Sequence, residues 1–112
     1  MAARAEEQSI HAALARFETA YEKLDARAAH NVWPTVDQKA LARAFGGLKS
    51  QELTFKGCKM AIAGVAASVD CEGWTTYVPR IGDDDPRTQQ RRWTFQMRKR
   101  QDAWTITEAF IR

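Results

Sequence analysis

Three side chains in this sequence are candidates for acid–base chemistry: Tyr21, His30 and Glu108. Histidine changes its charge near neutral pH, and a tyrosine or a carboxylic acid in an apolar cavity can donate a proton or stabilise developing negative charge. Catalysis by these groups requires at least two of them to converge in one cavity. If all three point to separate places, the sequence favours a binding or assembly role.

Glu108 is the strongest single candidate because of its place in a strand-like pattern. It has the parity of Trp104, Ile106 and Phe110, so regular alternation turns it toward the apolar face of a sheet. A buried charge without a partner is costly. A position at the rim, or a pairing with a neighbouring arginine, is therefore favoured over a free inward carboxylate.

Other charged residues have simpler structural explanations. Asp37 stands where a helix begins after Pro34, and aspartate at that place caps free backbone N–H groups. Asp70 and Glu72 alternate with apolar neighbours, so we expect them on the solvent face of a strand. His11 is expected on an exposed helix surface, whereas no acidic partner can be assigned to His30.

The composition is that of an ordinary globular protein. With 112 residues, 45% of them apolar and 28% charged, the chain is predicted to form one domain over residues 1–112. No apolar run approaches the roughly 20 residues that cross a bilayer, so no membrane association is expected. A net charge of +3 is too small to indicate nucleic acid binding. A basic cluster, partly offset by three nearby aspartates, comprises Arg87, Arg91, Arg92, Arg98, Lys99 and Arg100.

Hydrophobic periodicity predicts three helices, over about 3–25, 26–33 and 36–46. In the first, apolar residues recur at steps of three and four and form one stripe: Ile10, Leu14, Phe17, Tyr21 and Leu24. Pro34 ends the second helix, and Thr35 or Asp37 caps the third. Gly46 and Gly47 close it.

After Leu48 the period changes to two, which predicts strands over about 50–63, 65–80, 87–100 and 103–111. A switch of parity at Gly57 indicates a bulge. The last hairpin is two-faced. Its inner side is expected to hold Trp93, Phe95, Met97, Trp104 and Ile106, and its outer side Arg92, Thr94, Gln96, Arg98, Thr105 and Thr107. Helices followed by an antiparallel meander define an α+β fold, with the sheet bent around the long helix into a cone that has a possible internal pocket.

The two cysteines lack metal-site spacing, so no metal and no cofactor is expected. Two reduced thiols in a cytoplasmic protein are the default expectation. A tight turn at residues 63–66 nevertheless places Cys58 opposite Cys71, within reach of a disulfide, unless the bulge at Gly57 shifts the register.

Three stretches carry a family resemblance: AALARFETAYEKLDA, VWPTVDQKALARAFGGL and RRWTFQMRKRQDAWTITEAF. They resemble the nuclear transport factor 2-like superfamily, also called SnoaL-like or cystatin-like, and in particular small bacterial domains. Some of those domains follow serine/threonine kinases, which would allow an extracytoplasmic location if the kinase spans a membrane. The superfamily includes isomerases, dehydratases, ligand-binding modules and dimerisation domains, so the fold alone does not specify a function.

The resemblance also bears on catalysis. Ketosteroid isomerase-like members use a tyrosine of the first helix as a proton donor to an oxyanion, but Phe17 occupies that position here and Tyr21 lies one turn later. The sequence therefore favours a non-catalytic module that binds a small apolar ligand or forms a homodimer through the outer sheet face. The expected ligand pocket comprises Phe17, Tyr21, Trp33, Trp74 and Glu108. The alternative is an acid–base enzyme of the isomerase or dehydratase type.

Overall fold

Two hydrophobic periods, one helical and one strand-like, divide the chain near Gly47. In the computed structural model, which describes residues 2–112, three helices precede four strands. The helices are α1 (Ala2–Glu22), α2 (Ala26–Val32) and α3 (Gln38–Gly46), and the strands are β1 (Leu48–Ala63), β2 (Ala66–Pro79), β3 (Arg87–Arg100) and β4 (Ala103–Ile111). Within these residues, no helix is both long enough and apolar enough to cross a membrane.

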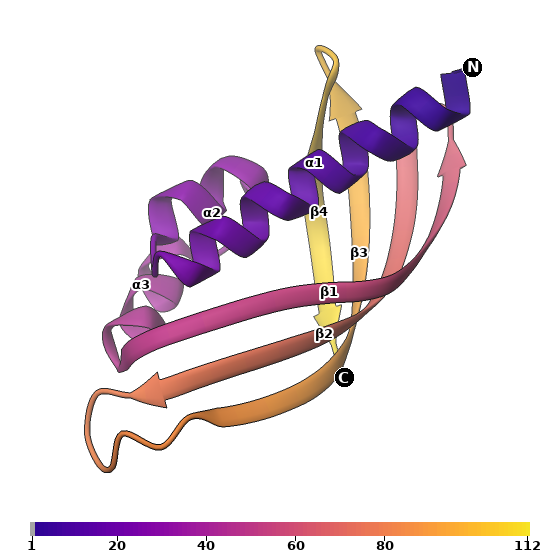
Figure 1. Cartoon of the computed structure of the whole chain (residues 1–112). Helices are drawn as coiled ribbons and strands as arrows, with labels where there is room; N and C mark the ends of the chain where they lie inside the picture. The colour runs from indigo at the N-terminus through magenta and orange to yellow at the C-terminus, as the bar shows by residue number, and fades with distance from the viewer. Residues whose placement is uncertain (1) are drawn as a thin grey trace.

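The strands form one antiparallel sheet in the order β1-β2-β3-β4, so each strand pairs with the next one along the chain. Figure 1 shows α1 crossing the concave side of the sheet, with α2 and α3 beside its C-terminal half. The long strands β1, β2 and β3 bend beneath it. The predicted α+β architecture, three helices on a bent four-stranded meander, is confirmed.

The core lies between α1 and the inner face of the sheet. Ile10, Leu14 and Phe17 of the predicted stripe are buried, as are the inner residues predicted for the last hairpin: Trp93, Phe95, Met97, Trp104 and Ile106. Alternate residues of each strand therefore face the helices, and their neighbours form the outer face. The packing of these two apolar surfaces is what holds the helical half on the sheet.

The helix boundaries follow from local capping. The first helix ends at Glu22, three residues earlier than expected, because Leu24 adopts a left-handed conformation with φ 53° and the Asp25 N–H donates to Ala20 O. Asp25 caps α2 by accepting from Ala28 N, and Asp37 caps α3 by accepting from Ala40 N, each at 3.0 Å. Asp37 is thus the N-cap, and Thr35 is not.

Strand β1 bends at a bulge. Gly57 has φ +61°, and the register of β1 and β2 shifts between Lys56 and Lys59. On the turn side of this shift, Lys59 pairs with Asp70, which is the register expected from the turn. Cys58 and Cys71 form a disulfide with Cα atoms 4.1 Å apart, and the default expectation of two free thiols is wrong.

Candidate functional site

Phe17 lies on α1 at the centre of the core, and it is fully buried. Five other aromatic rings surround it. The distances between ring centroids are 4.7 Å to Tyr21, 5.9 Å to Phe95, 6.1 Å to Trp93, 6.2 Å to Trp33 and 6.3 Å to Phe55. Two of these pairs are tilted, two are edge-on and the pair with Phe55 is stacked, and separations of this size are typical of packed aromatic pairs. The centre of the cone is therefore filled with side chains.

Tyr21 lies on the inner side of α1 between Phe17 and Phe45, whose ring centroid is 5.0 Å away. Burial among these rings disfavours the phenolate and raises the pKa of Tyr21 to about 12. The hydroxyl is consequently protonated across the physiological range. It can donate a hydrogen bond, but it cannot act there as a base.

Trp93 carries an indole N–H that is buried without a hydrogen-bond partner in the described part of the chain. The indole lies directly over Gly73, where an added Cβ atom would come within 2.4 Å of its Nε1. Among the residues that the structure describes, no charged or polar residue is fully buried. The core therefore offers two donors, Tyr21 and Trp93, and no buried carboxylate or imidazole to accept a proton.

Glu108 does not point into the cone, and the alternation that turned it inward is wrong at this position. The register of β3 and β4 shifts between the pairs Met97–Ile106 and Gln96–Glu108, so Thr107 is an extra residue. Beyond this bulge the parity reverses, and Glu108 and Phe110 are exposed on the outer face.

A long-range contact accompanies the bulge in β4. Trp33 Nε1 donates to Thr35 Oγ1 at 3.0 Å, and Thr35 Oγ1 donates to the backbone oxygen of Thr107 at 2.7 Å. The Thr107 hydroxyl in turn donates to Gln96 O at 3.0 Å. The bulged residue is thus held from both sides. Trp33, a predicted pocket residue, packs against the core and orients this chain of hydrogen bonds.

The remaining candidates are also separated. His30 is half-buried on α2, and His11 is exposed on α1. Trp74, a predicted pocket residue, is 39% exposed on the outer face, because it alternates with the buried Gly73. Of the predicted pocket, the structure brings together only Phe17, Tyr21 and Trp33. Tyr21 and Glu108 lie on opposite sides of the sheet.

Hollows on the described surface do not coincide with these residues. The groove between α1 and α2 has a volume of about 420 Å³ and is lined by small and polar side chains including Ala15, Thr19 and Asn31. Four other open hollows of about 360 to 580 Å³ lie elsewhere on the surface. None of the five is lined by a predicted pocket residue. Within residues 2–112, no three histidine, cysteine, aspartate or glutamate side chains gather as a metal site would require.

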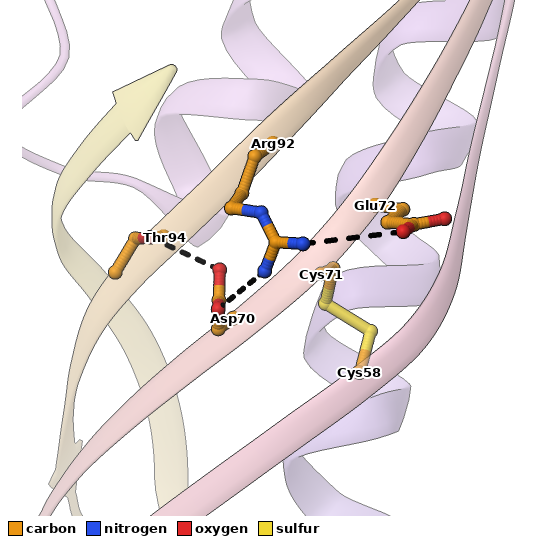
Figure 2. Close-up of polar contacts among 6 residues, drawn as sticks. All are labelled: Cys58, Asp70, Cys71, Glu72, Arg92 and Thr94. Atoms are coloured by element: carbon orange, nitrogen blue, oxygen red, sulfur yellow. Dashed lines mark hydrogen bonds and ion pairs between the residues drawn. A yellow bond between two sulfur atoms is a disulfide. The ribbon is translucent and has the colours of Figure 1, made fainter. Parts of the chain in front are cut away.

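The outer face carries an ordered polar cluster (Figure 2). Arg92 donates to Asp70 at 2.9 Å and lies 4.0 Å from Glu72, and Thr94 donates to Asp70 at 3.2 Å. Asp70 and Glu72 point outward as the alternation predicts, on either side of the inward Cys71. These side chains are partly exposed, so each ion pair contributes about 1 kcal/mol or less to stability.

A second polar cluster ties the N-terminal half of α1 to the last hairpin. The carboxylate of Glu6 accepts from Lys99 Nζ at 2.6 Å and from Trp104 Nε1 at 2.7 Å. These hydrogen bonds, first that from Lys99 and then that from Trp104, lower the pKa of Glu6, and the bond to Glu6 raises the pKa of Lys99. Sequence reasoning missed this contact, because no local pattern joins residues that lie so far apart along the chain.

No family model and no curated protein matches the sequence significantly. Solved structures do match the fold. A candidate dehydratase of the nuclear transport factor 2-like family from Streptomyces avermitilis is 15% identical with a TM-score of 0.83, covering 96% of each chain. A nuclear transport factor 2-like superfamily protein from Salmonella enterica is 17% identical with a TM-score of 0.81, over 94% of this chain and 88% of the other.

A third similar structure is a candidate calcium/calmodulin-dependent protein kinase II association domain from Xanthomonas campestris. It is 13% identical with a TM-score of 0.74, over 91% of this chain and 83% of the other. Identities this low establish the architecture and leave the activity open. The chain has the nuclear transport factor 2-like fold that its sequence resembles.

Proposed function

We propose that this domain is a non-catalytic assembly module that forms a homodimer through the outer face of its sheet. The observation that carries the proposal is the filled cone. Phe17 and the five rings around it occupy the space in which a ligand or substrate would have to bind. Because side chains occupy the interior, we expect this domain to bind its partner through its surface.

The distribution of the titratable groups supports the same conclusion. Acid–base catalysis needs a proton donor and an acceptor within hydrogen-bond reach of one substrate. Tyr21 lies in the core, Glu108 on the outer face and His30 on α2. Because these three side chains lie in separate places, no two of them can act together on one substrate, and the enzyme hypothesis loses its support.

The outer face has the features of a protein-binding surface. Phe110, which is 50% exposed, and Trp74 project from it on either side of the Arg92 cluster. Aromatic residues and arginine are enriched in protein interfaces, and an ordered polar cluster there supplies directional contacts. One of the similar structures is a candidate association domain, which supports an assembly role.

Sedimentation equilibrium of the 112-residue chain tests the proposal. We expect a monomer–dimer equilibrium, and Phe110→Glu should weaken dimerisation at least about 30-fold, as for an interface hot spot. Ile81→Glu is the matched control, because it introduces the same charge at an apolar residue that is 89% exposed away from the strands. A wild-type chain that stays monomeric at millimolar concentration would contradict the proposal.

A small-ligand site in the cone is a second candidate, because Tyr21 and Trp93 place two hydrogen-bond donors in one aromatic core. A dehydratase is among the similar structures. Crystals soaked with small apolar ketones would test it. Density beside Tyr21, and loss of binding in Tyr21→Phe, would favour this candidate over the assembly module.

Cellular compartment can be tested through the disulfide. The sequence predicts a cytoplasmic protein, whereas a Cys58–Cys71 bond is typical of oxidising compartments. Mass spectrometry of the protein, alkylated immediately upon lysis of its own cells, distinguishes them. Two alkylated cysteines would support the cytoplasm, and none would support an extracytoplasmic location.

A further inference from the structure

The Cys58–Cys71 disulfide joins two sulfur atoms in unequal surroundings (Figure 2). Cys71 lies on β2, between β1 and β3, and is 1% exposed. Cys58 lies on β1, an edge strand of the sheet, and is half-buried at the margin of the core. A thiolate reacts with the sulfur of a disulfide that it can reach, so the difference in burial favours attack on Cys58.

The direction of attack favours the same sulfur. A thiolate displaces the leaving sulfur from the opposite side of the sulfur that it attacks. The side of Cys71 that faces away from Cys58 faces β3, where its cross-strand partner Trp93 is 4% exposed. The side of Cys58 that faces away from Cys71 faces no further strand of the sheet formed by residues 2–112. Only Cys58 therefore has an approach from solvent.

The bulge in β1 keeps the space beside Cys58 open. The register of β1 and β2 shifts between Lys56 and Lys59, so Gly57 and Cys58 lie outside the regular ladder. Gly57 is exposed with φ +61°, and a Cβ atom there would meet nothing within 4 Å. A small molecule can therefore come close to Cys58 along the backbone of its neighbour.

We propose that Cys58 is a site of reversible modification by low-molecular-mass thiols, which open the disulfide in the folded chain. The thiolate of the small thiol attacks Cys58 Sγ and forms a new S–S bond with it. The bond between Cys58 and Cys71 breaks, and its electron pair leaves with Cys71 Sγ, which takes up a proton. The attacking sulfur is oxidised and Cys71 is reduced, so the exchange needs no other reactant.

The folded chain can accommodate this exchange. On both sides of Gly57 and Cys58, β1 stays paired with β2. Breaking the covalent bond therefore releases two residues that the ladder does not hold, and it leaves the strand in place. The product carries the small thiol on the sheet edge and a free thiol at Cys71 in the core. Exchange at Cys58 is independent of dimerisation through the outer face.

Peptide mapping of the product tests which sulfur is attacked. The oxidised 112-residue chain is mixed with glutathione, quenched with acid at early times, unfolded and alkylated with N-ethylmaleimide. Glutathione should be found on Cys58, with the alkyl group on Cys71, at least about tenfold more often than the reverse. The control is the same reaction in concentrated urea. Unfolding exposes both sulfurs, so the ratio should fall to within about threefold of one.

Urea dependence tests whether attack occurs in the folded chain. A reaction that requires global unfolding follows the population of unfolded molecules, which rises steeply with urea. Attack on the accessible Cys58 does not depend on that population. The second-order rate constant for glutathione should therefore change less than about twofold at urea concentrations below the unfolding transition.

Ile106→Ala makes the same comparison without urea. Ile106 is fully buried on β4, at the opposite edge of the sheet from Cys58. Its truncation should raise the unfolded population at least about 30-fold, yet the exchange rate should stay within about twofold of wild type. Ile106→Val is a milder truncation at the same position and gives the comparison if the alanine variant does not fold.

Three results would overturn the proposal. These are no glutathione adduct while the chain stays folded, an adduct on Cys71 as often as on Cys58, and a rate that rises with the unfolded population in urea or in the Ile106 variants. Sedimentation equilibrium measures the oligomeric state separately, so any of these results leaves the proposed homodimer untouched.

Discussion

The inner and outer faces of the sheet are built from the same four strands but are held by different forces. Inward residues are apolar and aromatic, and they pack against α1 without a buried charge among residues 2–112. Outward residues form exposed ion pairs and hydroxyl bonds, as at Arg92 and Asp70. Burial of apolar area is worth several kcal/mol per large side chain, whereas an exposed ion pair is worth about 1 kcal/mol or less. Stability should therefore depend on the inner face and recognition on the outer one.

Truncation of one phenylalanine on each side is the strongest test of this difference. Phe17→Ala should lower the free energy of unfolding by about 3–5 kcal/mol, because it leaves a cavity among five rings. Phe110→Ala, at a half-exposed outer residue, should lower it by less than about 1 kcal/mol. Urea denaturation of both variants measures the two values. Equal losses would show that the outer face is as important for folding as the core.

Reduction of the disulfide tests how far the inner face depends on a covalent link. The Cys58–Cys71 bond spans 13 positions and closes a short loop, so reduction should cost about 3 kcal/mol of stability. Urea unfolding with and without dithiothreitol measures the loss. The double variant C58A/C71A is the control and should be insensitive to the reductant. An unchanged midpoint for the wild-type chain would mean that packing alone fixes the bulge.

Gly73 tests how closely the inner face is packed. A Cβ atom at this position would come within 2.4 Å of the buried Trp93 indole, so Gly73→Ala should cost about 1–3 kcal/mol as the ring is displaced. Gly46→Ala is the matched control, because a Cβ atom there meets nothing within 4 Å. It should be neutral or slightly stabilising in a helix. A tolerated Gly73→Ala would indicate spare volume inside the cone.

Glu6 provides the smallest and most specific test, through pH. Its pKa is lowered in the folded state from 4.5, so it adds stability that is present above the unfolded pKa and lost as the pH falls through the folded value. Glu6→Gln should therefore be less stable than wild type at pH 7, and this difference should shrink as the pH falls below about 4.5. Glu7→Gln, at an exposed neighbour, should unfold like wild type at each pH. A pH-independent difference for Glu6→Gln would contradict the ionic role.

Local patterns were enough to predict most of the architecture. The two hydrophobic periods predict the order of helices and strands, and the inward set from Trp93 to Ile106 is confirmed. The register at Cys58 and Cys71 also follows from the sequence, because the turn beside it is short. These features depend on side chains within a few residues of one another, whose geometry the chain itself fixes.

Glu108 marks where sequence reasoning ends. Its alternation with Ile106 is regular in the sequence. In the structure, Thr107 is an extra residue in β4 and reverses the parity beyond it. The Thr107 carbonyl accepts a hydrogen bond from Thr35, which lies 72 residues earlier in the chain. Glu6, Lys99 and Trp104 likewise meet only in the folded chain. The filled cone depends on rings from several elements, which no spacing along the chain places at one point.

The sequence by itself therefore determined the α+β order, the two faces of the sheet and the pairing that allows the disulfide, because each rests on local periodicity. Tertiary structure alone decided that Tyr21, His30 and Glu108 are apart, and that the cone is filled around Phe17. The physical reason is that these features depend on where distant segments stop, bulge and pack. Only the folded chain brings such segments together.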